Sequence, residues 1–363
     1  MKRLQQHREG LIVYDAGLPN FPRNFTRDGI ISAFLAEDSQ MLKEQLAFCA
    51  RHQGKKIDPY TGEEPGKIFH EYPGFILNEH STEFNACDTT ALFLIGHNIY
   101  LEHTHDKSLL QEQQTQFHKA VDYILSHLEN HFFVESPAFC ESDQFALDVT
   151  YWKDSVILDR ENGKPIYPVT YTLAHIQNMC ALRKAAKLLG SKELEKEAIL
   201  MYDALQTLFD EELGVFYLAY DKQGTIQGVS SDSLHALFYL QPGDLSKQQL
   251  DRIVEASKAL VTHAGYLTLS PNDAKRAKSF YHSRTIWPFE QAIINMGALK
   301  FGLTEVAQIS ERVFAYLDTE PEILIQEKNG RLKKGRDSND YPEAKNTCDP
   351  QLWTIAAKKY FSN

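Results

Sequence analysis

The chain has 363 residues, of which 43% are hydrophobic and 24% charged, a composition that excludes a disordered protein and leaves room for one large or two medium domains. Its formal net charge of -11 repels phosphate backbones, so we expect no binding to nucleic acid. No apolar run of about 18 residues is present and no apolar stretch follows the polar N-terminus, so we expect neither a membrane span nor a signal peptide, and a cytoplasmic location.

Helical periodicity recurs along the whole chain. Apolar residues spaced by three and four predict helices over 117–128, 179–189, 194–208, 253–260 and 306–316, with weaker patterns over 28–53, 88–102, 287–301 and 350–361.

Short turns and one hairpin are also expected. Gly190-Ser191 and Gly302-Leu303-Thr304 predict tight turns, with glycine as the C-cap and Ser or Thr as the next N-cap. Short turns of this kind place neighbouring helices antiparallel. Strand-like alternation is confined to brief pieces such as 215–220, where we expect a small hairpin with a turn over 221–224. The predicted fold is therefore all-α with a small β-hairpin decoration.

Four long connections separate the helices, over 54–85, 131–169, 265–286 and 318–349. Passive connections between helices normally take about 2 to 8 residues, and longer ones usually build a site. Long connections alternate with short ones, which predicts helical hairpins arranged in a ring with all long loops on one face. No Pro/Ser/Gly-rich linker divides the chain, so we expect a single domain over 1–363.

Two carboxylates have similar surroundings in distant loops. Asp154 lies in the segment Tyr151-Trp152-Lys153-Asp154-Ser155, and Glu343 follows Tyr341-Pro342. A buried Asp154 with a raised pKa can protonate a glycosidic oxygen, whereas a surface Asp-Ser pair that caps the next helix is the plainer interpretation. Glycoside hydrolysis needs two such groups, one protonated and one ionised, on opposite sides of one sugar.

Further polar residues at helix starts and in the first long loop are candidate sugar ligands. Carboxylates at a helix start are also explained by the helix dipole or by N-capping, so both interpretations stay open for them. The donors and acceptors of the loop around 62–71 suit a polyhydroxylated ligand. The candidates are Arg27, Asp28, Lys67, His70, Glu71 and Asp88.

Aromatic and ionisable residues near the two carboxylates complete the candidate set. Trp152, Trp287 and Tyr281 have faces that can stack on a pyranose ring or fill the protein interior. Lys153 and His282 are candidate ligands of sugar hydroxyl groups. Glu290 is a rival general base, but its place in the first turn of a helix has a structural explanation, so Glu343 ranks first.

Six segments in the same order resemble the catalytic domain of bacterial amylo-alpha-1,6-glucosidase-like proteins, and together they cover nearly the whole chain. They are Arg27-Asp28, EPGKIFHE (64–71), DTTALFL (88–94), YWKDS (151–155), YHSRTIWPFEQAI (281–293) and YPEAKNTCDPQLWTIAA (341–357). The last segment also resembles alkaline/neutral invertases, and the plan is similar to glucoamylases and trehalases. The resemblance implies an (α/α)6 barrel of six helical hairpins with an inverting glycosidase site at one mouth, Asp154 as general acid and Glu343 as general base.

The chain departs from the family pattern in three places. Leu173 to Gln177 stand where the family usually has a Glu, and His282-Ser283-Arg284 replace His-Asn-Gly. Ala344 to Thr347 replace the Leu-Phe-Cys-Gly that usually follows the Pro-Glu motif. The identity of the sugar therefore stays open.

No metal or cofactor is expected. The five cysteines show no CxxC motif, and their odd number favours a reducing compartment over a disulfide framework. The fourteen histidines include no HExxH motif and no His-Cys cluster.

The predicted function is inverting hydrolysis of an α-glucosidic or related oligosaccharide, with the two carboxyl groups roughly 6.5 to 9.5 Å apart. The expected partner is a small carbohydrate, and the oligomeric state is left open. One alternative is a sugar epimerase or isomerase on the same barrel, similar to N-acylglucosamine epimerases, which would use His70, His175 or His282. Another is a carbohydrate-binding protein without catalysis.

Overall fold

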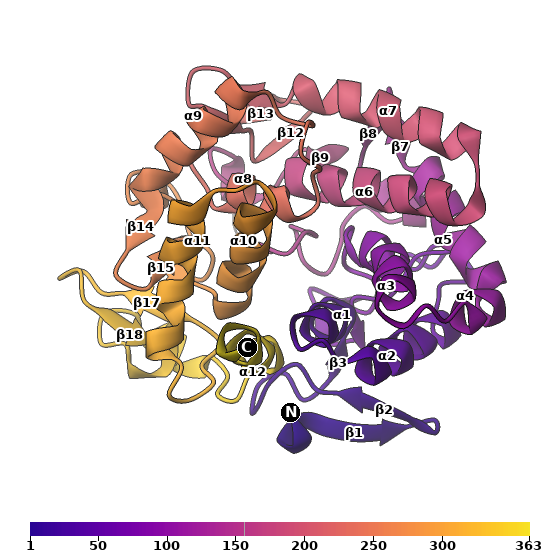
Figure 1. Ribbon diagram of the computed structural model, residues 1–363, viewed down its shortest axis with the longest axis horizontal. Coiled ribbons are helices and arrows are strands. Elements are labelled where there is room, and N and C mark those ends of the chain that lie inside the picture. Colours follow the sequence, from indigo (N-terminus) through magenta and orange to yellow (C-terminus); the bar gives the residue numbers. More distant parts are fainter. Residues whose placement is uncertain (156) are drawn as a thin grey trace.

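The structure is a computed structural model that describes residues 1–155 and 157–363 (Figure 1). Helices dominate the fold, and the strands form small sheets of two or three strands. None of the described helices combines the length and the apolar character that a bilayer crossing requires. All five cysteines are buried and free.

An inner set of helical segments surrounds the centre of the molecule (Figure 1). Each member packs against the next in chain order, and the last packs against the first, so the contacts close into a ring. The members are α1 (Thr26–Leu35), α3 (Thr89–Thr104), α6 (Thr172–Leu189), α8 (Asp232–His235) with the 3-10 turn η4 (Ala236–Phe238), α10 (Pro288–Lys300) and α12 (Leu352–Ser362).

An outer set of helices packs on the inner set, each against the inner helix that precedes it in the chain. All ten residues of α1 are buried, whereas the buried residues of the outer helix α7 follow the predicted one-sided spacing, Leu194, Ala198, Met201 and Leu205. The outer helices are α2 (Ser39–Arg51), α5 (Gln114–Ser126), α7 (Lys192–Gln206), α9 (Lys247–Ser257) and α11 (Thr304–Glu311), and the short α4 (Ser108–Glu112) precedes α5.

The helix boundaries confirm some predictions and correct others. Gly190 ends α6 in the left-handed conformation with φ 65°, and the Ser191 hydroxyl accepts a hydrogen bond at the start of α7, as predicted. Gly302 also has a positive φ of 71°, but Leu303 rather than Thr304 is the N-cap of α11. The single helix predicted over 28–53 is wrong, because the chain breaks at Glu37 with φ 50° between α1 and α2.

The segment 215–220 is divided between two sheets instead of forming one hairpin. β11 (Val215–Phe216) pairs with β10 (Phe209–Asp210), while β12 (Ala219–Asp221) pairs with β13 (Gly224–Ile226) around the predicted turn. β9 (Val169–Tyr171) adds a third strand beside β12.

The other strands are short antiparallel pairs, and β16, β17 and β18 form a second three-stranded sheet. These strands are β1 (Gln5–Arg8), β2 (Leu11–Tyr14), β3 (Asn24–Phe25), β4 (Glu71–Tyr72), β5 (Ile76–Leu77), β6 (His80–Ser81), β7 (Leu128–Glu129), β8 (Phe132–Phe133), β14 (Val261–Thr262), β15 (Gly265–Tyr266), β16 (Thr285–Ile286), β17 (Leu324–Gln326) and β18 (Leu332–Lys334).

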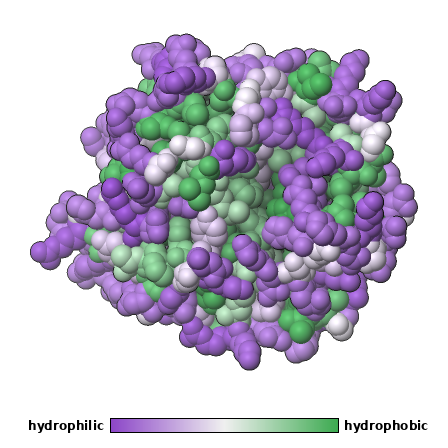
Figure 2. All heavy atoms as spheres, in the orientation of Figure 1, coloured by the Kyte–Doolittle hydropathy of each residue, from purple (hydrophilic) through white to green (hydrophobic). Residues whose placement is uncertain are grey.

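The long connections lead into the N-terminal ends of the inner helices. Residues 52–88 precede α3, 267–287 precede α10 and 335–351 precede α12, and these stretches hold only short strands and turns among the described residues. The surface in Figure 2 is mainly hydrophilic, with apolar residues gathered in a hollow near its centre.

Candidate active site

A cavity of about 80 Å³ lies where three inner helices begin, at the first turn of α1 and at the starts of α10 and α12. Loops contribute the other walls. The cavity is lined by Ala16, Phe21, Phe25, Arg27, Asp28, His70, Trp152, Asp154, Tyr281, His282, Trp287, Glu322, Gln351 and Trp353.

Three carboxyl groups with raised pKa values share this cavity. Burial raises the pKa of Asp154 to about 7, although the nearby Arg27 guanidinium opposes the change. Burial likewise raises the pKa of Glu322 to about 7 and that of Asp28 to about 8. Clustered carboxyl groups of this kind are typical of acid/base sites, because each one disfavours the ionisation of its neighbours.

Glu322 is held in place by hydrogen-bond donors. The Tyr281 hydroxyl donates to Oε1, and the backbone N–H of Cys348 donates to Oε2 over 2.6 Å. Both hydrogen bonds lower the pKa of Glu322 and so partly offset its burial. Donors of this kind stabilise the ionised form of a carboxyl group.

Asp154 has a different environment. Its side chain is 30% exposed, and its Oδ1 lies 3.7 Å from Nδ1 of His282. That nitrogen is 2.7 Å from the Ser155 hydroxyl, and burial keeps the pKa of His282 well below its usual value. The imidazole is therefore neutral near pH 7, and it does not hold Asp154 in the ionised form. Among the described residues, no side chain donates a hydrogen bond to the Asp154 carboxyl group.

Arg27 and Asp28 start α1 with their side chains in the cavity. The Arg27 guanidinium donates two hydrogen bonds, of 3.0 and 2.8 Å, to the carboxylate of Asp88, which is fully buried and does not line the cavity. Asp88 therefore positions Arg27, and it lies away from the cavity where the sequence predicts that it binds the sugar. Asp28 accepts a 3.1 Å hydrogen bond from Gln351 Nε2.

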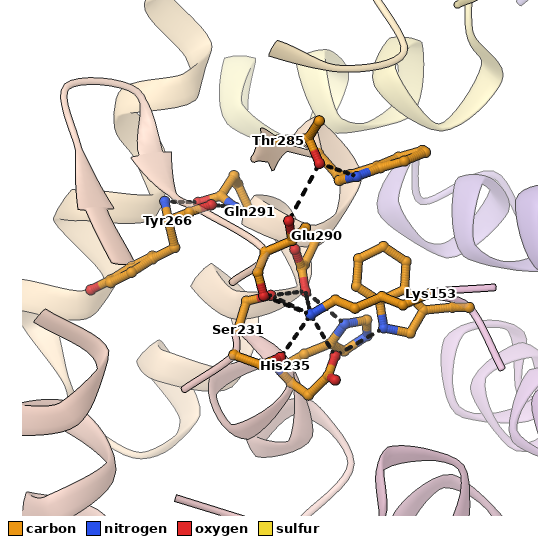
Figure 3. Close-up of polar contacts among 12 residues, drawn as sticks. Lys153, Ser231, His235, Tyr266, Thr285, Glu290 and Gln291 are labelled. Carbon is orange, nitrogen blue, oxygen red and sulfur yellow. Dashed lines mark hydrogen bonds and ion pairs between the residues drawn. The ribbon is translucent and has the colours of Figure 1, made fainter. Parts of the chain in front are cut away.

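Lys153 and Glu290 belong to a buried network behind the cavity (Figure 3). Lys153 Nζ donates to the hydroxyl groups of Ser230 and Ser231 over 2.8 and 2.9 Å, and it lies 2.9 Å from Asp232 Oδ1. Glu290 accepts a 2.7 Å hydrogen bond from Ser231 and is 3.9 Å from Lys153. Neither residue lines the cavity, whereas the sequence predicts both at the sugar, and their burial gives them a structural role in this network.

The same network positions the loop that carries the candidate acid. The indole Nε1 of Trp152 donates to Asp232 over 3.1 Å, so two consecutive residues before Asp154 are bound to the start of α8. The sequence pattern around Asp154 thus has a structural explanation: Trp152 and Lys153 hold the segment, and Asp154 is left facing the cavity.

Lys67 and Glu71 also lie outside the cavity lining, contrary to the predictions. Glu71 is bound by Arg23 and by the Thr82 hydroxyl. Lys67 is fully buried, with its Nζ 3.0 Å from Glu64. His70, from the same loop, does line the cavity, and burial keeps its pKa well below the usual value.

A buried group of candidate metal ligands lies beside Lys67. One ligand atom each from Glu64, His127 and Glu135 lie within 4.8 Å of one another. The Lys67 ammonium forms an ion pair with Glu64, and burial raises the pKa of the Glu135 carboxyl group, which favours its neutral form. The group therefore has a cation of its own, and it is separate from the cavity lining.

Glu343 is the main correction to the predicted site. It lies in the 3-10 turn η9 (Pro342–Asn346), is exposed, and is absent from the lining of the cavity that contains Asp154. The expectation that Glu343 faces Asp154 across a water-sized gap is therefore wrong. Its neighbour Tyr341 stacks on Phe280 instead, with ring centroids 5.8 Å apart.

The prediction missed three cavity residues that are chemically important, Glu322, Gln351 and Trp353. Glu322 lies in a predicted site-building connection and precedes the apolar run Ile323 to Ile325, which leads into β17. The sequence signal that could have identified Glu322 as a buried carboxyl group is its position next to this apolar segment. Trp353, in α12, is only 6% exposed, and it borders the cavity.

By sequence the chain matches no family model and no curated protein. In three dimensions it is similar to the GH63 mannosylglycerate hydrolase from Thermus thermophilus in complex with Tris and D-glycerate, with a TM-score of 0.69, 12% identity, and coverage of 100% of this chain and 98% of that chain. A structure described as wild-type glycosidase gives a TM-score of 0.63 with 13% identity, over 99% and 92% of the two chains. The GH78 rhamnosidase of Bacillus sp. GL1 gives 0.60 with 14% identity, over 94% of this chain and 31% of the other. This chain therefore has a helical glycosidase fold.

Proposed function

We propose that the protein is an inverting glycoside hydrolase that removes a terminal sugar from a small substrate, on an (α/α)6 barrel that forms one catalytic domain over 1–363. The observation that carries this proposal is the pair Asp154 and Glu322, two carboxyl groups with pKa values near 7 that line one cavity. Inverting hydrolysis requires one carboxyl group to be protonated and the other to be ionised at the working pH.

Their surroundings assign the two roles. Glu322 is stabilised as a carboxylate by donors from Tyr281 and Cys348, so it is the general base that takes a proton from the attacking water. Asp154 accepts no side-chain hydrogen bond among the described residues, and we assign it as the general acid that protonates the departing oxygen. Repulsion from Asp154 is among the causes that raise the pKa of Glu322. Repulsion between two carboxylates is mutual, so ionisation of one group favours the protonated form of the other.

A second cavity supports the role of Asp154 as the acid. It measures about 210 Å³, and Asp154 lines it as well as the first cavity. Its other walls include Asn78, Val149, Ser155 and Lys278. An acid that protonates the glycosidic oxygen must stand between the sugar and the leaving group. We therefore assign the sugar to the first cavity and the leaving group to the second.

The size and lining of the first cavity favour a single sugar ring. Its volume of about 80 Å³ is well below the roughly 300 to 1,000 Å³ of drug-sized ligand sites. Trp152, Trp287 and Trp353 border it, and each is at most 6% exposed, so these aromatic side chains restrict the space around one ring. Asp28 has a pKa of about 8 and stays protonated at neutral pH, which suits it to donate a hydrogen bond to a sugar hydroxyl.

The decisive experiment compares Asp154→Asn, Glu322→Gln and Glu343→Gln with the wild type. The substrate panel contains aryl glucosides and mannosides, α-linked disaccharides, and the glucosides, mannosides and glycosyl esters of small hydroxy acids. Proton NMR identifies the first-formed anomer. We expect Asp154→Asn and Glu322→Gln to lose about 10²- to 10⁴-fold in kcat, the usual contribution of a general acid or base. Glu343→Gln should retain wild-type turnover because Glu343 is exposed and outside the cavity.

Glycosyl fluorides separate the two roles, because fluoride leaves without protonation. Asp154→Asn should therefore hydrolyse the fluoride well, whereas Glu322→Gln should not. The kcat/KM of the wild type should follow a bell centred near pH 7, since both pKa values lie there. Wild-type turnover in Glu322→Gln, or retention of the anomeric configuration, would refute the assignment.

One observation favours a second candidate, a sugar epimerase or isomerase. His70 and His282 both line the cavity, as that alternative requires, whereas His175 is buried in α6 and hydrogen-bonded to the backbone of Phe133. Such an enzyme exchanges a carbon-bound hydrogen of a free sugar with solvent deuterium, which hydrolysis does not. Deuterium incorporation that His282→Gln abolishes would favour this reaction over hydrolysis.

A further inference from the structure

A larger cavity lies at the opposite end of the inner helices. It measures about 430 Å³, and it is lined by the C-terminal halves of α3, α6 and α10 together with residues 238–241. The candidate active site, by contrast, lies at the N-terminal ends of α1, α10 and α12. The two cavities share no residue, so this one has no place in the hydrolytic mechanism.

The charge of this cavity is opposite to that of the protein. Its lining includes the cations Arg183, Lys184, Lys187 and Lys300 against one acid, Glu102, although the chain as a whole carries a net charge of -11. Cations near helix C-termini are favoured by the helix dipole, which accounts for Lys187 and Lys300 at the ends of α6 and α10. The dipole does not explain why so many cations surround one cavity.

Two of these cations have no carboxylate partner in the described part of the chain. Lys184 Nζ donates to the amide oxygen of Asn98 over 2.6 Å, and Lys300 Nζ donates to the backbone oxygen of Phe238 over 2.5 Å. Arg183, in contrast, is paired with Asp244 at 2.5 Å. Lys300 is largely exposed, but partial burial, with repulsion from Lys184 as a further cause, lowers its pKa to about 8. A bound anion would relieve this repulsion.

The floor of the cavity is apolar. Phe34 and Phe238 stack with ring centroids 5.3 Å apart and an angle of 11° between the rings. Ile95, Ile99 and Met296 complete the apolar wall. A ligand that fits both features has an anionic group at the lysines and an apolar or aromatic body over the phenylalanines.

We propose that this cavity is a binding site for a small organic anion, a carboxylate or phosphate with an apolar body, held by Lys184 and Lys300. The ligand would contact α3, α6 and α10 at once, and so it would stabilise the inner ring of helices. Binding to the folded state alone raises the melting temperature by mass action.

The test uses phenyl phosphate and inorganic phosphate as probes of the full chain at constant ionic strength, by isothermal titration calorimetry and thermal melting. The variants are the double substitution Lys184→Gln/Lys300→Gln and a control, Lys196→Gln/Lys345→Gln. The control removes the same charge at two exposed positions outside the cavity. Melting without ligand verifies that each variant is folded.

We expect phenyl phosphate to bind the wild type at least about tenfold more tightly than inorganic phosphate, because only phenyl phosphate covers the apolar floor. Lys184→Gln/Lys300→Gln should weaken phenyl phosphate binding by about tenfold or more, and the control variant should bind like the wild type. The proposal is overturned by the absence of saturable binding, by equal binding of the two probes, or by equal binding to both double variants. Equal binding to the two double variants would also be the result if phenyl phosphate bound in the active site, because both variants retain all active-site residues.

Discussion

Replacing Lys153 with methionine tests whether the buried network behind the active site supports the fold. The Lys153 side chain is 1% exposed, and its ammonium group is 2.9 Å from Asp232 and hydrogen-bonded to Ser230, Ser231 and the backbone oxygen of Thr268. Methionine fills a similar volume but leaves the Asp232 carboxylate buried without its cation. Removing one partner of a buried ion pair typically costs about 3–5 kcal/mol.

The expected loss converts into a measurable shift. With an unfolding entropy of about 2.1 cal/mol/K per residue over 363 residues, a loss of 3–5 kcal/mol lowers the Tm by about 4–7 °C. Urea denaturation gives the free energy of unfolding directly. In a double-mutant cycle with Asp232→Asn, the two losses should not add, because both substitutions break the same pair.

The control is Lys164→Met, which breaks a surface pair with Asp148. That pair has a similar length of 2.8 Å, but the two side chains are 51% and 33% exposed, so the expected loss is at most about 1 kcal/mol. If Lys153→Met costs less than about 1 kcal/mol and instead raises KM, Lys153 contacts the substrate and the reasoning from burial is refuted.

Three further predictions concern pH, packing and capping. The pKa of Asp28 is raised from 3.8 to about 8, so its contribution to stability is complete below about pH 4 and is lost as the pH rises through 8. Asp28→Asn should therefore flatten the fall in Tm across this range, as measured by calorimetry. An unchanged pH profile of the Tm would contradict the raised pKa. Gly29→Ala should lower the free energy of unfolding, measured in urea, by about 1–3 kcal/mol, although alanine has the better helix propensity. The added Cβ would lie 2.4 Å from the side chain of Gln45, which two hydrogen bonds hold against Asn24. A gain in stability would show that Gln45 moves freely. Ser191→Ala should lower the free energy of unfolding by about 1 kcal/mol because it removes the N-cap of α7, whereas Ser191→Asp should keep a cap and wild-type stability. Equal stability of the wild type and both variants would show that the cap has no effect.

The active site was partly predictable, because several of its residues lie in recognisable local settings. Arg27 and Asp28 at the start of α1, and Trp287 just before α10, are expected near a cavity from their position at a helix start behind a loop, and they line it. Asp154 stands out by its neighbours Trp152 and Lys153. Trp152 and Lys153 are expected to contact the sugar, but in the structure they bind Asp232 and hold the segment in place.

The second carboxyl group could not be chosen by the same reasoning. Glu343 and Glu322 both follow a proline in the connection 318–349, so their local sequences look alike. Their difference lies in burial: Glu322 is 1% exposed and receives hydrogen bonds from Tyr281 and Cys348, whereas Glu343 faces the solvent. Tyr281 lies 41 residues away from Glu322, so this contact has no local signature.

What the sequence by itself determined is the helical character of the chain, most of the helix positions, and the division into short turns and long connections. These properties depend on contacts between residues three or four apart and on the conformational freedom of residues such as Gly190, which are local. The tertiary structure alone decided which carboxyl groups meet, which lysine is buried behind them, and that a separate, cationic cavity lies at the far end of the inner helices. Those outcomes depend on how loops distant in sequence converge, and on the removal of charged groups from water when they do.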